Sequence, residues 1–384
     1  MNAKDPIYLD SHATTPVDPR VLEAMLPFFA GHFGNASSRN HPFGWKAAKA
    51  VDQAREQVAL LIGARLREVV FTSGATESNN LAIKGIARRA PAGRRHIVTI
   101  STEHRAVLDP CRALERDGFR VTYLDVDVEG KVDLDRLRDA VRDETLLVSV
   151  MSANNEIGVL HPLADIAKIA HARGALFHCD AAQSAGLIPL NVKELDVDLV
   201  SLSAHKMYGP KGIGALYVAK RAAAIEIEPL IDGGGHERGF RSGTLNVPAI
   251  VGFGKASEVC GELAESDSAR LRALRDRLWS MLSRLDGIHL NGPVEPRLSH
   301  NLNVRVDGVH GESLLKAIAG DVAVSSGAAC ATASAEPSHV LRAVGLSDDA
   351  ARASIRFGLG RFNTEQEIDA AAAIVADAVR HLRR

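Results

Sequence analysis

The chain has 384 residues, and 46 Lys and Arg against 47 Asp and Glu give it a formal net charge of −1, which argues against a generally basic protein that binds nucleic acid or a membrane surface through charge. Apolar residues make up 46% of the chain and charged residues 24%, which excludes a largely disordered protein. At about 150 residues per domain, this length predicts two domains.

Short apolar strands alternate with helices through the first 218 residues. A helix with one apolar face is predicted at Phe43–Ile62, ended by Gly63, and another at Pro162–Arg173. Several predicted strands are apolar on both faces, as in a parallel sheet covered by helices. These strands are Glu68–Thr72, His96–Ser101, Val121–Leu124, Leu146–Met151, Ala175–Asp180 and Asp198–Ser203. The alternation predicts an α/β fold.

The order of elements changes after about residue 218. Residues 228–249 are loop-like, and a long helix is predicted over Val251–Leu285. Shorter elements follow, namely strand Ser299–Val306, helix Glu312–Ile318, strand Val322–Ser326, strand Ser354–Gly358 and helix Thr364–Arg383. This order predicts a smaller α+β domain that begins near residue 260.

The cysteines and the N-terminal segment indicate the expected compartment. The four cysteines show no CxxC spacing and are too few for a disulfide framework. Residues 1–6 contain no apolar signal core, and no apolar run approaches the roughly 18 residues of a membrane span. We therefore expect a soluble, cytoplasmic protein with reduced thiols.

Polar residues follow several predicted strands at their C-terminal ends, where open α/β sheets bind ligands. The segment Thr72–Glu77 has small residues at the start of a predicted helix, where main-chain N–H groups could bind a phosphate. The alternative is a capping turn, with Thr or Ser as the cap and Glu as its partner, that serves only to begin the helix. Asp180 closes an apolar strand, where it could face a protonated ring nitrogen or make a structural hydrogen bond. In His178–Asp180, strand alternation turns Cys179 away from its two neighbours, so we expect Cys179 in the core rather than in a metal site.

Four further segments carry reactive groups, each with a simpler alternative. Lys206 follows an apolar strand and could act as an amine nucleophile, or it could be a hairpin lysine in solvent. His104 could stack on a planar ligand or be structural. The glycine-rich segment Gly233–Thr244, with two arginines, is either a loop that handles anions or a mobile linker. Cys330 has no bulky apolar neighbours, which indicates a reactive thiol or an inert surface cysteine.

These features together match the needs of pyridoxal phosphate. Its aldehyde needs an amine, its phosphate a cradle of donors, and its ring nitrogen an anion that keeps it protonated so that the ring accepts electrons. A histidine can stack on the ring. The cofactor does not itself require Cys330, which therefore adds a second nucleophile.

At Ser203–Lys206 and Cys330 the sequence resembles the cysteine desulfurases of the NifS/IscS type, in the class V aminotransferase family of pyridoxal-phosphate enzymes. The resemblance runs almost end to end. The segments that carry it are Tyr8–Asp10, Ala13–Pro16, Thr72–Asn80, Glu103–His104, Asn154–Gly158, Asp180 with Gln183–Ser184, Ser203–Gly214, Gly233–Thr244, the Cys330 loop and Ser354–Phe357. It implies the fold type I of these enzymes, with a mostly parallel seven-stranded sheet in a large domain over 16–260. It also implies a small domain, formed by 1–15 and 261–384, that carries a mobile catalytic loop at about 325–338.

The resemblance implies a role for each matching position. Lys206 would hold the cofactor covalently, Asp180 would pair with its ring nitrogen, and His104 would stack on the ring and help to move protons. Arg356 would bind the substrate carboxylate. The remaining implied contacts are Ala75, Thr76, Ser203 and His205 to the phosphate, Asn155 and Gln183 to the ring or its phenolic oxygen, Asn155 also to the substrate, and Thr244 to the phosphate of a neighbouring subunit.

The implied reaction converts L-cysteine to L-alanine and leaves the sulfur as a persulfide on Cys330. The sulfur would pass to an iron–sulfur scaffold protein or another thiol acceptor, and Cys330 could also serve as a transient ligand of a [2Fe–2S] cluster on a bound scaffold. The Thr244 contact implies a homodimer, and neither nucleic acid nor a membrane is expected as a partner. The alternatives are a selenocysteine lyase-type β-elimination and a non-catalytic sulfur-relay or assembly subunit. A relay subunit would need none of Lys206, Asp180 and Arg356.

Overall fold

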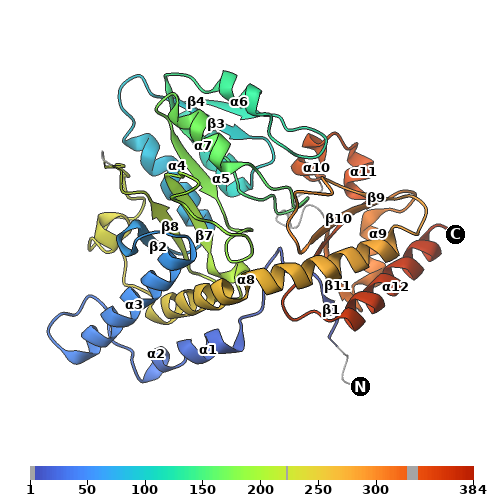
Figure 1. Cartoon of the computed structure of the whole chain (residues 1–384), viewed down its shortest axis with the longest axis horizontal. Helices are drawn as coiled ribbons and strands as arrows, with labels where there is room; N and C mark the ends of the chain where they lie inside the picture. Colours follow the sequence, from blue (N-terminus) through green and yellow to red (C-terminus); the bar gives the residue numbers. More distant parts are fainter. Residues whose placement is uncertain (1–4, 222–223, 327–335) are drawn as a thin grey trace.

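A computed structural model describes residues 5–221, 224–326 and 336–384 of the chain (Figure 1). Its central sheet has seven strands in the order β2-β8-β7-β6-β5-β3-β4. The strands are β2 (Val69–Thr72), β3 (His96–Ile100), β4 (Arg120–Leu124), β5 (Thr145–Ser149), β6 (Leu176–Asp180), β7 (Leu199–Ser203) and β8 (Gly214–Val218). Strand β8 is antiparallel to both neighbours, and the other pairs are parallel. The predicted α/β fold is confirmed, and the C-terminal ends of the six other strands meet at one edge of the sheet.

Helices cover both faces of this sheet. The helices of this part of the chain are α1 (Pro19–Met25), α2 (Pro27–Ala30), α3 (Pro42–Leu61), α4 (Ala75–Arg88), α5 (Arg105–Arg116), α6 (Leu134–Ala140) and α7 (Leu163–His171), with the short 3-10 helices η1 (Leu66–Glu68), η2 (Ala204–Lys206) and η3 (Glu237–Gly239). Val70 packs with α4 and α5 on one face, whereas Val69 and Phe71 pack with α3 and α7 on the other. Because both faces are covered, the strands are apolar on both sides.

The C-terminal part forms a four-stranded antiparallel sheet, β12-β13-β10-β9, beside a two-stranded parallel sheet, β1-β11. Its elements are β1 (Ile7–Tyr8), β9 (Ile288–Leu290), β10 (Asn301–Val306), α9 (Gly311–Ile318), β11 (Val322–Ala323), β12 (Ser325–Ser326), α10 (His339–Ala343), α11 (Asp348–Arg352), β13 (Ser354–Gly358) and α12 (Glu365–Leu382). Leu9 packs in the same core as Leu302 and Val322, so the N-terminal segment lies in this part of the molecule.

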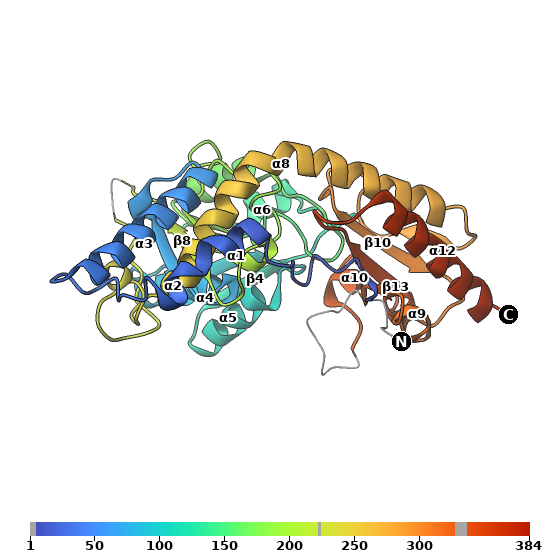
Figure 2. The same cartoon turned by 90° about the horizontal axis from the view of Figure 1, so that it is seen from below.

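Helix α8 (Val247–Leu282) runs from the large sheet to the C-terminal part, where it lies beside α12 (Figure 2). Cys260 belongs to the core of the large sheet, whereas Leu271 and Leu274 belong to the core of the C-terminal sheet. Helix α8 therefore leaves one hydrophobic core and enters the other between Cys260 and Leu271, without a break in the helix. The division into 16–260 and the remainder stays a prediction.

Several predicted boundaries shift by one to four residues in the structure, and two of the differences have a clear physical cause. The long helix begins four residues earlier than predicted because Asn246 caps it, with its side chain accepting from the third helical residue, and Pro248 fits the first turn. The segment Val322–Ser326 is not one strand. Its first two residues pair with β1 and its last two with β13, so the chain changes sheets at Val324.

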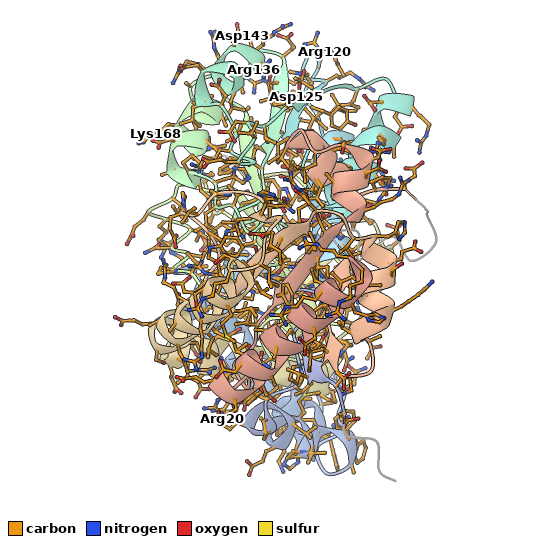
Figure 3. The ribbon with its side chains drawn as sticks, turned by 90° about the vertical axis from the view of Figure 1, so that its right-hand side faces the viewer. Arg20, Arg120, Asp125, Arg136, Asp143 and Lys168 are labelled. Carbon is orange, nitrogen blue, oxygen red and sulfur yellow. The ribbon has the colours of Figure 1, made fainter. Side chains whose placement is uncertain are left out.

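Charged side chains of both signs project from the surface near β4, α6 and α7. Figure 3 labels Arg120, Asp125, Arg136, Asp143 and Lys168 there, all of them exposed. This mixture of signs agrees with the near-zero net charge of the chain. The positive and negative side chains offset one another, so this edge carries no strong electrostatic potential of one sign. Over the ranges that the structure describes, no helix combines the length and apolar character that a bilayer crossing requires.

Candidate active site

The C-terminal edge of the large sheet borders a cavity of about 540 Å³. It is lined by ten of the predicted site residues, namely Ala75, Thr76, His104, Asn155, Asp180, Gln183, Ser203, His205, Lys206 and Arg356. Thr244 does not line it and is exposed. Cys330 lies outside the described residues. The structure therefore brings together side chains from both parts of the chain, while their chemical roles stay predictions.

The N-terminus of α4 borders this cavity, with Gly74 as its N-cap residue at φ +149°. Gly214 permits a close approach to this turn, because a Cβ on Gly214 would lie 2.6 Å from the Gly74 Cα. The Ser203 hydroxyl lies 3.9 Å from the point that a Cβ on Gly74 would occupy. Gly74 has no side chain with which to cap the helix, so neither Thr72 nor Ser73 is its N-cap residue, although the Glu77 carboxylate accepts from the Ser73 N–H at 2.8 Å as a box partner would. The first N–H groups of α4 are available to an anion.

His205 adds a neutral donor or acceptor to this end of the cavity. Its Nδ1 lies 3.1 Å from Thr14 Oγ1. Burial lowers the pKa of His205 to about 4, and the charges of Lys206 and Lys211 act in the same direction. The imidazole is therefore neutral at pH 7, and the positive charge near the α4 N-terminus comes from the lysines and the helix dipole.

Asp180 ends β6 and is 6% exposed. Its Oδ2 accepts from Asn79 Nδ2 at 2.6 Å and its Oδ1 from the Ala182 N–H at 2.9 Å. Two neutral donors fix the orientation of the carboxylate and leave lone pairs for a cationic group in the cavity. Sequence reasoning gave Asn79 no role, although it lies in the segment Thr72–Asn80.

Lys206 is the last residue of η2, directly after β7. Its Nζ donates to the main-chain oxygens of His12 and, at 2.9 Å, of Ala13. The amine therefore points into the cavity, and the alternative of a hairpin lysine in bulk solvent is wrong. Sequence reasoning assigned no role to His12.

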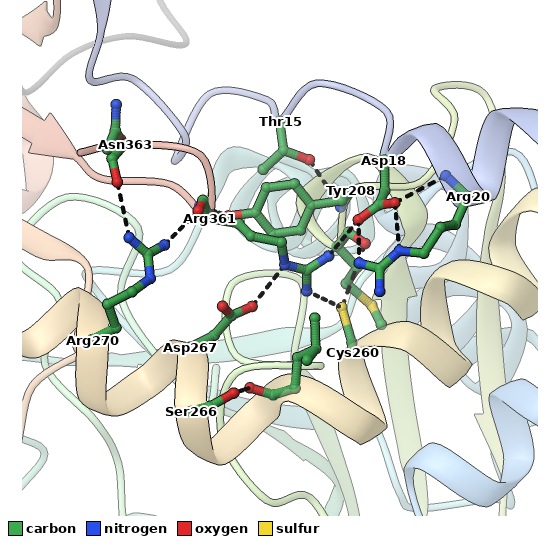
Figure 4. A network of polar contacts seen from close by, with 12 residues as sticks. Thr15, Asp18, Arg20, Tyr208, Cys260, Ser266, Asp267, Arg270, Arg361 and Asn363 are labelled. Carbon is green, nitrogen blue, oxygen red and sulfur yellow. Dashed lines mark hydrogen bonds and ion pairs between the residues drawn. The ribbon is translucent and has the colours of Figure 1, made fainter.

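The turn after Lys206 is clamped from two sides (Figure 4). Tyr208 has φ +60°, a left-handed conformation that is unfavourable for a bulky residue. Its N–H donates to Thr15 Oγ1 at 2.9 Å, and its carbonyl accepts from the Asp18 N–H at 2.9 Å. The Arg361 guanidinium lies 4.2 Å from the Tyr208 ring centroid, and the Arg361 N–H donates to the Tyr208 hydroxyl at 2.6 Å. The N-terminal segment and the C-terminal part together fix the position of the lysine.

Replacing Arg361 by methionine should destabilise this junction. The guanidinium pairs with Asp18 at 3.0 Å and with Asp267 at 2.7 Å, and both carboxylates are buried. Because Asp267 would lose this cation, we expect the free energy of unfolding to fall by about 3 kcal/mol. Urea unfolding followed by circular dichroism measures the loss. Arg270→Met is the matched control, since exposed Arg270 donates to main-chain oxygens, and it should cost about 1 kcal/mol. Equal losses in the two variants would contradict this account.

Arg356 lies on β13 and is 2% exposed. Its Nη2 pairs with Asp10 Oδ1 at 3.0 Å, and its Nη1 donates to the Asn155 carbonyl at 3.1 Å. Its Nε is buried without a hydrogen-bond partner among the described residues. An incoming carboxylate would satisfy that N–H and interact with the same guanidinium. Sequence reasoning gave Asp10 no role, although Asp10 also accepts from Ser325 Oγ at 2.9 Å.

His104 is the N-cap residue of α5, and its Nδ1 accepts from the Ala106 N–H at 3.1 Å. This bond fixes the half-buried ring at the wall of the cavity. The structural role predicted as an alternative is therefore real, and the same bond holds the ring in place for a ligand.

The glycine-rich segment Gly233–Thr244 is attached to the protein through its arginines. Arg241 pairs with Glu77 at 2.9 Å, and Arg238 donates to the Val69 carbonyl at 2.9 Å. Neither arginine lines the cavity. The segment therefore anchors the first turn of α4 instead of offering its arginines to a ligand there.

Cys111, Cys179 and Cys260 are buried and reduced. Burial raises the pKa of the Cys111 thiol to about 12 and that of the Cys179 thiol well above its ordinary value. The prediction that Cys179 lies in the core is confirmed. Where the structure describes side chains, no cluster of three or more His, Cys, Asp or Glu could hold a metal ion. The reactivity predicted for Cys330, including a cluster ligand, falls outside the described residues.

Comparison with known proteins agrees with this geometry. The Aminotransferase class-V family matches residues 7–371. The chain is 58% identical over 381 residues to the cysteine desulfurase IscS of Anaeromyxobacter sp. (strain Fw109-5), which covers 99% of this chain and 94% of that relative. Among solved structures, a NifS-like protein superposes with a TM-score of 0.90 at 39% identity, covering 98% of this chain and 99% of the other. SspA in complex with cysteine superposes with a TM-score of 0.82 at 38% identity, covering 93% and 100%. The chain therefore belongs to the class V aminotransferase family of pyridoxal-phosphate-dependent enzymes and, within it, to the cysteine desulfurases of the IscS type.

Proposed function

We propose that this enzyme converts L-cysteine to L-alanine with pyridoxal phosphate and captures the sulfur as a persulfide on Cys330. The observation that carries the proposal is the cavity at the sheet edge, which is lined by a lysine amine, a buried carboxylate, a helix N-terminus and a buried arginine. Full-length similarity to relatives named cysteine desulfurase supports the same reaction.

The residues of the cavity fit this cofactor. The first turn of α4, with Ala75, Thr76, Ser203 and His205, suits a phosphate, Asp180 suits a protonated ring nitrogen, and Lys206 suits the aldehyde. The proposed ring contacts are His104 by stacking and Asn155 and Gln183 by hydrogen bonds. When bound, the cofactor supplies an electron sink for the electron pair left when the Cα proton of the substrate leaves.

The protein's own groups would bind the substrate and move protons and sulfur. Arg356, with Asn155, binds the carboxylate of L-cysteine, and the Lys206 amine takes the proton from Cα. The Cys330 thiolate attacks the substrate sulfur, so that an S–S bond forms and the Cβ–S bond breaks with its electron pair left on carbon. Protonation of Cβ, helped by His104, completes the methyl group. The Lys206 ammonium then returns a proton to Cα, where the electron pair held since the first step re-forms the Cα–H bond of alanine. The substrate sulfur remains as the persulfide.

The persulfide must leave the site for an acceptor. We propose that a thiol of an iron–sulfur scaffold protein or of another sulfur carrier receives it, in the cytoplasm. Cys330 would then also serve as a transient ligand when a [2Fe–2S] cluster grows on a bound scaffold as cargo.

Quantifying alanine and protein-bound persulfide after mixing with L-cysteine tests the reaction, with L-selenocysteine as the second substrate. We expect equal amounts of alanine and persulfide from L-cysteine in the first turnover. If alanine forms from L-selenocysteine but not from L-cysteine, and no persulfide appears, the lyase alternative would be favoured. No alanine from either substrate would favour a non-catalytic relay subunit.

Arg356→Lys should weaken binding of the substrate carboxylate. Lysine keeps the charge but lacks the two parallel N–H donors, so we expect KM for L-cysteine to rise by about 10- to 100-fold with a smaller change in kcat. Steady-state alanine production measures both constants. Arg305→Lys on neighbouring strand β10 is the control, because Arg305 pairs with Asp307 away from the cavity. An unchanged KM in Arg356→Lys would exclude the carboxylate-binding role.

We propose that the enzyme is a homodimer in which exposed Thr244 reaches the partner's cofactor phosphate. A cluster of exposed apolar side chains on α1–α3 supports a partner surface there. The cluster comprises Leu22, Leu26, Phe29, Phe33, Phe43 and Trp45, which are 48–65% exposed.

The double variant Phe29→Ser/Phe33→Ser should shift the protein toward monomer, because it removes two aromatic anchors of the proposed interface. Sedimentation velocity measures the species. Leu60→Ser, at an apolar position that is also exposed but lies outside the cluster, should stay dimeric. A fully active monomeric wild type would refute the shared site.

A further inference from the structure

His12 lies at the wall of the cavity and is 1% exposed. Its Nδ1 is 3.0 Å from Gln183 Oε1, its Nε2 is 3.1 Å from Asn301 Nδ2, and its ring centroid is 4.2 Å from that of His300. Its main-chain oxygen accepts from Gln183 Nε2 at 3.1 Å and from Lys206 Nζ. One residue therefore contacts both the amide and the amine assigned to the cofactor.

The surrounding hydrogen bonds determine which nitrogen of His12 carries the proton. Arg297 Nη1 donates to Asn301 Oδ1 at 3.0 Å, and Asn301 Nδ2 donates to the Glu156 carbonyl at 3.0 Å. The amide of Asn301 therefore turns its nitrogen toward His12 Nε2, which must accept. The proton of a neutral imidazole is then on Nδ1, and it is donated to Gln183 Oε1.

The environment keeps His12 neutral. Burial lowers its pKa well below the ordinary value, and the neighbouring His300, Arg356 and Lys206 act in the same direction. Arg356 and Lys206 are the cations that face it, and His300 is the titratable ring packed against it. A protonated His12 would also meet the Asn301 donor with a donor of its own. A single neutral tautomer therefore fits this position.

This tautomer fixes the orientation of the Gln183 side-chain amide. The oxygen Oε1 faces His12 Nδ1 and accepts its proton, so the two N–H groups of Nε2 point away from the imidazole ring. One N–H of Nε2 goes to the His12 carbonyl, and the second remains for a ligand in the cavity that Gln183 lines. A flipped amide would set its nitrogen against the His12 donor and its oxygen against the His12 carbonyl, and would lose both bonds.

We propose that His12 is a positioning residue of the cofactor site, whose Nδ1 proton fixes Gln183 as a hydrogen-bond donor to the phenolic oxygen of bound pyridoxal phosphate. The proposal rests on the cofactor site proposed above. The phenolic oxygen gains charge when the proton that it shares with the attached lysine nitrogen leaves. A donor at this oxygen therefore favours the deprotonated form.

The test is a pH titration of the visible absorbance of the reconstituted protein. His12→Leu should raise the titration midpoint by about one unit, because Gln183 loses the Nδ1 donor to its Oε1 and keeps only its contact with the main-chain oxygen of residue 12. His12→Asn keeps an N–H donor near the position of Nδ1 and should restore the wild-type midpoint. Gln183→Leu should match His12→Leu, and the double variant should show no further shift. His161→Leu removes a buried histidine that lines a different cavity and should leave the midpoint unchanged.

A His12→Leu midpoint equal to that of the wild type would overturn the positioning role, as would additive shifts in the double variant. If circular dichroism shows that His12→Leu does not fold, His12→Ser carries the same expectation, because its hydroxyl is too short to reach Gln183. A wild type that gains no visible band with pyridoxal phosphate would instead refute the cofactor site itself. The two failures are therefore distinguishable.

Discussion

Replacing Lys206 by alanine is expected to abolish the visible absorbance of the reconstituted enzyme and to lower alanine formation from L-cysteine by about 10³-fold or more. The amine is the proposed point of covalent attachment and the proposed base at Cα. It is held at the wall of the cavity by the main-chain oxygens of His12 and Ala13, a geometry that a lysine elsewhere cannot reproduce.

Lys211→Ala is the matched control for this variant, because Lys211 lines the same cavity on the loop that follows. It should keep the visible band and most of the activity. The measurements are absorbance after dialysis against cofactor-free buffer, mass spectrometry after borohydride reduction, and alanine production. A borohydride-fixed cofactor on Lys211, or an unchanged band in Lys206→Ala, would refute the assignment.

Replacing Cys330 by serine is expected to leave the visible band unchanged and to abolish persulfide formation, with turnover of L-cysteine reduced by about 10³-fold or more. A serine hydroxyl is not ionised near neutral pH, and oxygen cannot hold the transferred sulfur as a persulfide. The other three cysteines are poor substitutes because burial raises the pKa of each thiol, and the thiolate is the nucleophile.

Peptide mass spectrometry after alkylation identifies the cysteine that carries the extra sulfur. Cys111→Ala is the control, since Cys111 lies in the core between α4, α5 and the sheet, and it should form the persulfide as the wild type does. A persulfide on Cys111, Cys179 or Cys260 in the Cys330→Ser variant would remove Cys330 from its proposed role. Loss of the visible band in Cys330→Ser would indicate a defect in cofactor binding instead.

The amino-acid sequence alone was enough to predict the central sheet and ten of the residues that line the cavity. Strands such as Val69–Thr72 are apolar on both faces because helices cover both sides, and that property is visible in a short window of sequence. Asp180 is the last residue of its strand and Lys206 stands three residues past the end of the next one, so the parallel order of these strands brings both residues to one edge. The division of Val322–Ser326 was missed because it depends on which strands lie on either side.

Only the tertiary structure decided how the site residues are held. Asp10 meets Arg356, Arg361 packs on Tyr208, and His12 bonds to Gln183 across 171 residues. The strength of these contacts comes from burial and from the geometry of donors and acceptors, which form when the two parts of the chain close on each other. A local sequence pattern determines in which direction a side chain leaves its own strand or helix. It does not determine which residue, distant in the sequence, that side chain contacts in the folded protein.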